Sequence, residues 1–86
     1  MKDFSLTFVT RSGCHLCKQA EPLVRATAAR YRADLEVVDI DSDDDLVRLY
    51  ALRVPVVLGP DGEIIAEGII DRKGLRRAVS AARRRS

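Results

Sequence analysis

The chain has two cysteines, Cys14 and Cys17, within the segment TRSGCHLCK at residues 10–18. The residues before this pair alternate between apolar and hydroxyl side chains, and those after it repeat at helical spacing. The pair is therefore predicted to lie where a strand passes into a helix. Three residues are almost one helical turn, so both thiols would lie on one face and could form a disulfide with little backbone movement. This arrangement indicates a redox-active dithiol.

The two thiols are predicted to play different roles. Cys14 falls at the helix N-terminus, where unpaired backbone N–H groups and the positive end of the helix dipole favour a thiolate. Cys17 lies one turn further in and is expected to be more shielded. Cys14 is therefore the predicted nucleophile, and Cys17 is predicted to resolve the mixed disulfide that Cys14 forms. His15 either assists the neighbouring thiol or points to solvent, and the sequence leaves both open.

Three other interpretations of the cysteine pair remain open. A structural disulfide across so short a loop would stabilise the chain by only about 2 kcal/mol, which is a weak reason for its presence. One chain cannot fill a tetrahedral metal site with two cysteines and one histidine, but two chains meeting at their cysteines could hold zinc or an iron–sulfur cluster through four thiolates. The third interpretation is a binding domain without catalytic turnover.

Composition limits the class of protein. With 86 residues, we expect a single domain over residues 1–86. Two cysteines are too few for a secreted disulfide scaffold, so we expect a reducing, cytoplasmic environment. The N-terminus lacks an apolar segment of signal or membrane-spanning length, and no membrane association is expected. The arginines of residues 81–86 suit the negative end of a helix dipole, and with a net charge of +2 no nucleic-acid partner is expected.

Hydrophobic periodicity predicts the order β-α-β-α-β-β-α. The predicted strands are Phe4–Thr10, Leu35–Ile40, Val54–Leu58 and Glu63–Glu67, with a turn at Gly59–Gly62. The predicted helices are Cys14–Arg32, a short helix that follows the capping residues Asp41–Asp45 and ends near Ala51, and Arg72–Arg84. Pro22 is expected to kink the first helix, and Asp71 to cap the last. The helix dipole explains the acidic run at residues 41–45, and no metal site is expected there.

These features together resemble the thioredoxin superfamily, and within it the glutaredoxin-like proteins, including a small branch with a CHLC-type motif. The resemblance rests on the dithiol segment, Pro22, the Val54-Pro55 pair and the sequence VDIDSD at residues 38–43. It covers essentially the whole chain. It implies an α/β, thioredoxin-like (glutaredoxin-type) fold with a central four-stranded mixed sheet flanked by helices.

The same resemblance implies an activity and a binding site. The expected activity is thiol–disulfide oxidoreduction in electron transport. Pro55 would match the family's cis-proline beside the dithiol, and the backbone of Val54 would be free to pair with a substrate peptide or with glutathione. Asp71 would hold the γ-glutamyl amine of glutathione, while Arg11 and Arg53 would bind its carboxylates. His15 would lie in this substrate site.

The expected partners follow from this activity. We expect a monomer without a bound cofactor, acting on a disulfide-containing protein or a glutathione mixed disulfide. Either glutathione or a flavin-dependent reductase would recycle it. Glutathione-binding glutaredoxins usually have an aromatic residue between the cysteines and a Gly-Gly pair before the last helix, where this chain has His15-Leu16 and Gly68-Ile69. The sequence therefore leaves the electron donor open.

Overall fold

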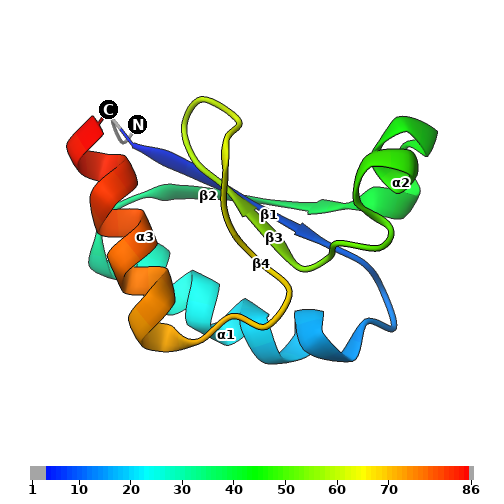
Figure 1. Ribbon diagram of the computed structural model, residues 1–86, viewed down its shortest axis with the longest axis horizontal. Coiled ribbons are helices and arrows are strands. Elements are labelled where there is room, and N and C mark those ends of the chain that lie inside the picture. The colour runs from blue at the N-terminus through cyan, green and yellow to red at the C-terminus, as the bar shows by residue number, and fades with distance from the viewer. Residues whose placement is uncertain (1–3, 86) are drawn as a thin grey trace.

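The elements of the chain follow the predicted order, with one short 3₁₀ helix added. The structure, a computed structural model, describes residues 4–85 (Figure 1). The strands are β1 (Ser5–Thr10), β2 (Asp34–Asp39), β3 (Val56–Leu58) and β4 (Ile64–Glu67). The helices are α1 (His15–Arg30), the 3₁₀ helix η1 (Ile40–Ser42), α2 (Asp44–Tyr50) and α3 (Arg72–Arg85).

The four strands form one mixed sheet in the order β2-β1-β3-β4, which confirms the predicted fold. β1 runs parallel to β2 and antiparallel to β3, and β3 and β4 are antiparallel neighbours. Parallel strands need a crossover connection, and α1 supplies it between β1 and β2. The segment that carries the cysteines therefore leaves the sheet from a central strand.

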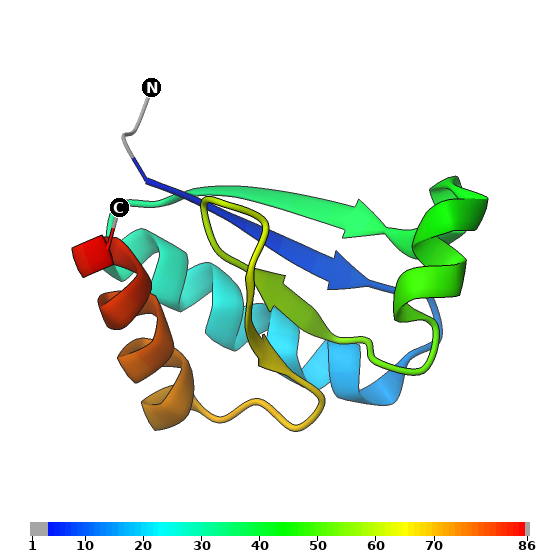
Figure 2. The ribbon, with the colours of Figure 1, turned by 45° about the horizontal axis from the view of Figure 1, so that its top comes forward.

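Residues of β1 alternate between two hydrophobic clusters, one on each face of the sheet. On one face, Phe8 and Val57 pack with the buried sides of α1 and α3. On the other face, Val9 and Val56 pack with Ile40 and residues of α2. Figures 1 and 2 show α1 and α3 together beneath the sheet, with α2 set apart at one end. Within residues 4–85, no helix is long and apolar enough to cross a membrane.

Five predicted strand boundaries differ from the observed ones by one or two residues, and two of the differences have identifiable reasons. β3 begins at Val56 rather than Val54, because Pro55 has no N–H to contribute to a strand ladder. β2 ends at Asp39, whose side chain accepts a hydrogen bond of 2.9 Å from the backbone N–H of Asp41 and so starts η1 at Ile40. The turn at Gly59–Gly62 is confirmed by a 3.0 Å hydrogen bond from the Gly62 N–H to the Gly59 carbonyl.

The predicted start of the last helix at Arg72 is confirmed, and the other predicted helix boundaries differ by one or two residues from those observed. Cys14 caps α1 instead of lying within it, and α1 ends at Arg30, two residues early. The short helix begins after Asp43, whose side chain accepts a hydrogen bond of 2.8 Å from the Asp45 N–H. Pro22 lies inside a continuous α1, and the kink there stays a prediction.

Replacing Phe8 tests whether the cluster beneath the sheet stabilises the fold. Phe8 is fully buried, and Phe8→Ala should lower the free energy of unfolding by about 3–5 kcal/mol through lost burial and the cavity left behind. Urea denaturation would measure this change. Leu52→Ala is the control, because Leu52 is fully exposed and its loss should change stability by about 0.5 kcal/mol or less. Equal effects of the two substitutions would contradict this account of the core.

Candidate active site

A tight turn places Cys14 between β1 and α1. The backbone N–H of Cys14 donates a hydrogen bond of 3.2 Å to the carbonyl of Arg11, the first residue after β1. Gly13 has a φ of 82°, which glycine adopts without steric cost. The chain therefore reverses within a few residues, and Cys14 follows directly from the central strand.

Cys14 is the N-cap of α1, and its sulfur occupies the place of a capping oxygen. Its Sγ accepts a hydrogen bond of 3.1 Å from the backbone N–H of Cys17. The two cysteines form a disulfide, with their Cα atoms 5.2 Å apart, which confirms the predicted pairing. In the reduced chain the same N–H points at the position where a Cys14 thiolate would carry its charge, and backbone donors at a helix start stabilise anions.

The two sulfur-bearing residues differ in exposure as the sequence predicts. Cys14 is half-buried, whereas Cys17 is 2% exposed. The residues between them face outward, and Leu16, predicted on the apolar side of the helix, is 38% exposed. His15 is exposed, and its Nε2 accepts a 3.1 Å hydrogen bond from the Gln19 amide one turn along α1. The His15 ring therefore contacts the next turn of its own helix.

The peptide bond between Val54 and Pro55 is cis, as the resemblance implies. Val56, the next residue, pairs with Val9, so Pro55 lies at the end of the sheet where the dithiol turn begins. The expectation of a free Val54 backbone is wrong for its N–H, which donates a 3.0 Å hydrogen bond to the carbonyl of Tyr50. The carbonyls in the last turn of a helix lack helical partners, and this bond satisfies one at the end of α2.

Both arginines predicted to bind glutathione carboxylates already bind carboxylates of this chain. Arg11 pairs with Asp41 through hydrogen bonds of 3.0 and 3.2 Å. Arg53 pairs with Glu67 through bonds of 2.9 and 3.2 Å, and this hydrogen bonding and charge raise the pKa of the Arg53 guanidinium above its ordinary value. Both pairs are partly exposed, and solvent screening makes the contribution of such pairs to stability small. A ligand carboxylate could therefore replace either partner.

Asp71 caps α3 as predicted. Its Oδ1 accepts a 2.6 Å hydrogen bond from the backbone N–H of Gly74. Asp71 and Glu67 also line one cavity of about 220 Å³ beside the start of α3. The structure thus brings Asp71 near the Arg53–Glu67 pair, while Arg11 lines a different cavity.

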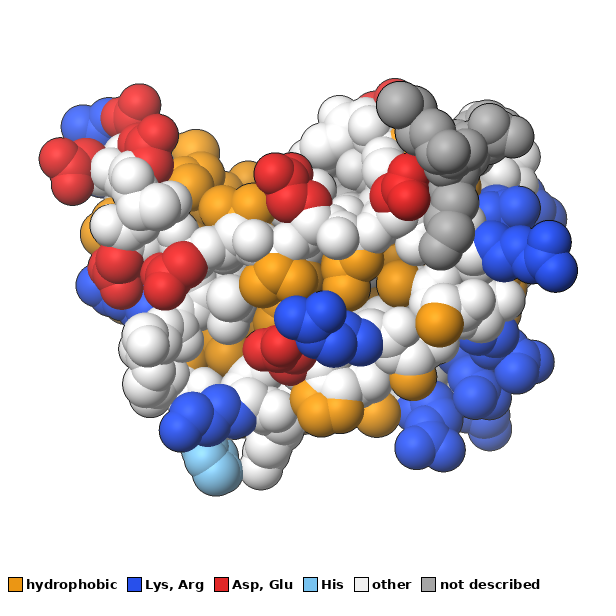
Figure 3. Space-filling view, turned by 180° about the vertical axis from the view of Figure 1, so that it is seen from behind, with side chains coloured by type: hydrophobic (Ala, Val, Ile, Leu, Met, Phe, Trp, Pro, Cys, Tyr) orange, Lys and Arg blue, Asp and Glu red, His pale blue; other side chains and the backbone are white. Residues whose placement is uncertain are grey.

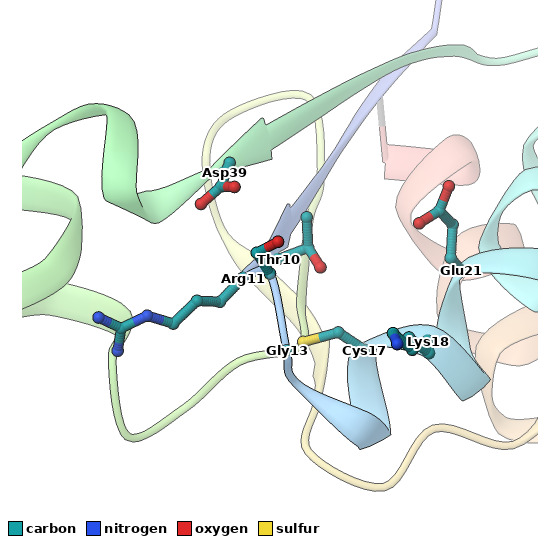
Figure 4. Close-up of a pocket in the computed structure, with 8 residues that line it drawn as sticks. Thr10, Arg11, Gly13, Cys17, Lys18, Glu21 and Asp39 are labelled. Atoms are coloured by element: carbon teal, nitrogen blue, oxygen red, sulfur yellow. The ribbon is translucent and has the colours of Figure 1, made fainter.

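The cavity that Arg11 lines also borders Cys17. It has a volume of about 240 Å³ and lies among the ends of β1 and β2 and the first turns of α1 (Figure 4). Glu21 and Asp39 both line it. Glu21 could have been found from the sequence, since it lies four residues after Cys17 on one helical face. Asp39 could not, because it depends on the parallel pairing of Thr10 with Asp39.

No group of three or more histidine, cysteine or acidic side chains is arranged for metal binding within residues 4–85. The sulfurs of Cys14 and Cys17 bind each other instead. The chemistry that this arrangement supports directly is the opening and closing of a disulfide at a helix N-terminus.

Comparison with known proteins places the chain in a family. Residues 5–80 match the family model of the glutaredoxin-like domain (DUF836). The chain belongs to this glutaredoxin-like family. It is 37% identical to protein XcR50 from X. campestris, covering 90% of this chain and 97% of that one with a TM-score of 0.71. No curated protein sequence matches it.

Other solved structures are also similar to this glutaredoxin-like chain. Protein Ne2328 from Nitrosomonas europaea is 28% identical over 92% of this chain and 94% of its own, with a TM-score of 0.72. A mutant thioredoxin from Halobacterium salinarum is also 28% identical, over 94% of this chain and 75% of its own, with a TM-score of 0.70. The family, these neighbours and the Cys14–Cys17 disulfide support a role of the thiol–disulfide oxidoreductase type.

The difference in exposure predicts selective alkylation of the reduced glutaredoxin-like chain. A limiting amount of iodoacetamide should modify Cys14 well before Cys17, because only Cys14 is accessible to the reagent. Peptide mass spectrometry at successive times would measure both modified fractions. The same reaction on chain unfolded in urea is the control and should remove the preference. Equal rates in the folded chain would show that Cys17 is not shielded.

Proposed function

We propose that this glutaredoxin-like chain is a dithiol oxidoreductase that reduces disulfides, with Cys14 as nucleophile and Cys17 as resolving cysteine. The observation that carries this proposal is the Cys14–Cys17 disulfide at the start of α1, with Cys14 half-buried and Cys17 2% exposed. An incoming disulfide can reach the first sulfur and not the second.

The first step is attack by a Cys14 thiolate on a substrate disulfide. A bond forms between Cys14 Sγ and one substrate sulfur, the substrate disulfide breaks, and its other sulfur leaves as a thiolate that takes up a proton. The N–H of Cys17, which lies 3.1 Å from Cys14 Sγ, stabilises the attacking anion.

In the second step Cys17 loses its proton and attacks Cys14 Sγ. This forms the Cys14–Cys17 disulfide and releases the second substrate sulfur as a thiol. Two electrons have then passed from the dithiol to the substrate. Glutathione or a flavin-dependent reductase returns the chain to the dithiol form.

The cavity beside Cys17 gives its proton a route out of a buried position. Glu21 and Asp39 each use one carboxylate oxygen in a hydrogen bond, to the Arg25 side chain and the Asp41 N–H respectively. The other oxygen of each remains available for water in a cavity of about 240 Å³. These carboxylates accept the Cys17 proton through water during the second step.

The substrate is a disulfide-containing protein or a glutathione mixed disulfide. For glutathione, the cavity beside α3 offers Asp71 to the amine, and Arg53 exchanges Glu67 for a ligand carboxylate. For a protein, the carbonyl of Val54 offers a backbone acceptor, since it receives no hydrogen bond from residues 4–85.

Single cysteine variants test the assigned roles. Turnover of a small glutathione mixed disulfide, coupled to NADPH through glutathione and glutathione reductase, should be lost in Cys14→Ser because no nucleophile remains. Cys17→Ser should accumulate a Cys14 mixed disulfide, visible by mass spectrometry, because no second thiol resolves it.

The same assay with thioredoxin reductase in place of glutathione distinguishes the two electron donors. Turnover in one coupled system and not the other would identify the donor. Wild-type turnover by Cys14→Ser in either system, or no Cys14-dependent turnover in both, would refute the proposed function.

Removing the two cavity carboxylates tests the proton route. The double variant Glu21→Gln/Asp39→Asn should slow release of the second substrate thiol by about 10²-fold at neutral pH, because general bases contribute about 10²–10⁴-fold. Stopped-flow measurement of single turnovers would separate this step from the first attack, which should keep its wild-type rate. Asparagine at position 39 preserves the cap of η1.

Glu36→Gln is the matched control, because Glu36 is an exposed β2 carboxylate that does not line the cavity. It should leave both steps unchanged. If the double variant resolves the mixed disulfide as fast as wild type, Cys17 loses its proton without these carboxylates. That result would leave the assignment of Cys14 and Cys17 intact.

A further inference from the structure

All the charged side chains of helix α3 are basic. Its 14 residues, RKGLRRAVSAARRR, contain no acidic side chain. The basic residues are Arg72, Lys73, Arg76, Arg77, Arg83, Arg84 and Arg85. No other helix in residues 4–85 combines basic residues with a complete lack of acidic ones, since Glu21 interrupts α1 and Asp44 and Asp45 open α2.

The basic residues of α3 share one side of the helix. Leu75, Val79 and Ala82 are at most 1% exposed and fix the side that faces the core. With about 100° of rotation per residue, the first four basic residues and Arg84 fall within an arc of roughly 140° on the solvent side. We call this surface the basic face: Arg72, Lys73, Arg76, Arg77 and Arg84.

Most of the basic face has no partner in the chain. Arg25 and Arg48 each pair with a carboxylate one turn away, with Glu21 and Asp45 respectively. Four members of the basic face make no ion pair and no side-chain hydrogen bond with residues 4–85, namely Arg72, Lys73, Arg76 and Arg77. Their charges are presented to solvent without neutralisation.

Helix stability does not explain this arrangement. Cations stabilise the C-terminal turn of a helix, which accounts for residues 83–85. Arg72 and Lys73 lie in the first turn, where the positive end of the dipole disfavours cations, and that turn has no acidic residue. The dipole explanation drawn from the terminal arginines therefore does not extend to the first half of α3.

The end of α1 extends the same positive surface. Arg83 donates a 2.7 Å hydrogen bond to the carbonyl of Tyr31, which places the last turn of α3 against the exposed residues Arg30 and Arg32. Figure 3 shows basic side chains gathered at this end of the molecule and acidic ones around α2 at the opposite end. Cys14 caps the start of α1, at the opposite end of that helix from Arg30.

We propose that the basic face binds the phosphate backbone of double-stranded nucleic acid. Residues 72–84 span about 18 Å of helix, a length over which a duplex carries roughly ten phosphate charges. Arginine, the main residue of the face, has a planar guanidinium that forms paired hydrogen bonds with phosphate oxygens. The partner is recognised by charge and spacing.

Helix α3 lacks the exposed side chains with which proteins bind membranes or single-stranded nucleic acid. A membrane-bound helix inserts apolar side chains, but those of α3 are buried against the sheet. Single-stranded nucleic acid stacks its bases on aromatic rings, and α3 has none.

Fluorescence anisotropy of a labelled duplex of about 20 base pairs, titrated with the full chain at about 25 to 200 mM salt, tests this proposal. Neutralising about four phosphates predicts a slope near −3.6 for log K against log salt concentration. Arg76→Gln/Arg77→Gln should reduce that slope to about −1.8 and weaken binding at every salt concentration. Both positions are exposed, so the variant should fold, and a thermal melt would verify this.

Arg25→Gln/Arg48→Gln is the matched control, since it removes the same net charge from exposed positions of α1 and α2. It should keep the wild-type slope. Lys73→Gln/Arg84→Gln provides a second, independent pair on the basic face and should behave as the first pair does. Thiol turnover should be unchanged in the two basic-face variants.

Three results would overturn the proposal. The first is that the duplex does not bind even at the lowest salt concentration. The second is that the control and basic-face variants lose duplex affinity equally. The third is that the chain binds phosphatidylserine vesicles but not the duplex. Because none of these measurements uses the cysteines, failure here is separable from failure of the proposed oxidoreductase function.

Discussion

The antiparallel pairing of β3 with β1 is the interaction on which the candidate active site depends. Val56 lies opposite Val9, and β1 is held on its other side by β2. The dithiol turn follows β1 and the cis peptide bond to Pro55 precedes β3, so this pairing places both at one end of the sheet. A slip of one residue would turn every side chain of β3 to the opposite face. Burial of Val56 and Val57 on opposite faces therefore holds the reactive groups in place.

A backbone N–H group at the start of α1 also contacts the reactive sulfur of Cys14. The first N–H groups of any helix need acceptors, and here one of them is bound by the sulfur of Cys14. Serine, threonine, aspartate and asparagine are the preferred residues at such a position. The chain places cysteine there instead, where the unmet donors of the helix favour the anionic form of a nucleophile. The reactive sulfur and the helix start thus depend on each other.

The dithiol site and helix α3 differ in how their positive charges are paired. Near the dithiol, Arg11 and Arg53 form ion pairs with Asp41 and Glu67 of the same chain. Along α3 the positive charge is left unmatched over the first half of the helix. Disulfide exchange requires access to one sulfur at the start of α1, whereas a polyanion requires an extended charged surface.

The sequence by itself determined the order of the elements, the fold class and the pairing of Cys14 with Cys17. The order and the pairing follow from spacing along a few turns or strands, because side chains three or four residues apart meet in any helix. The fold class came from the resemblance to a known family. The tertiary structure decided which polar groups are occupied and which are free. The Val54 N–H bonds to Tyr50, Arg53 pairs with Glu67, and Asp39 reaches the cavity beside Cys17. These contacts depend on strand register and on turns between distant segments, where local patterns carry no information.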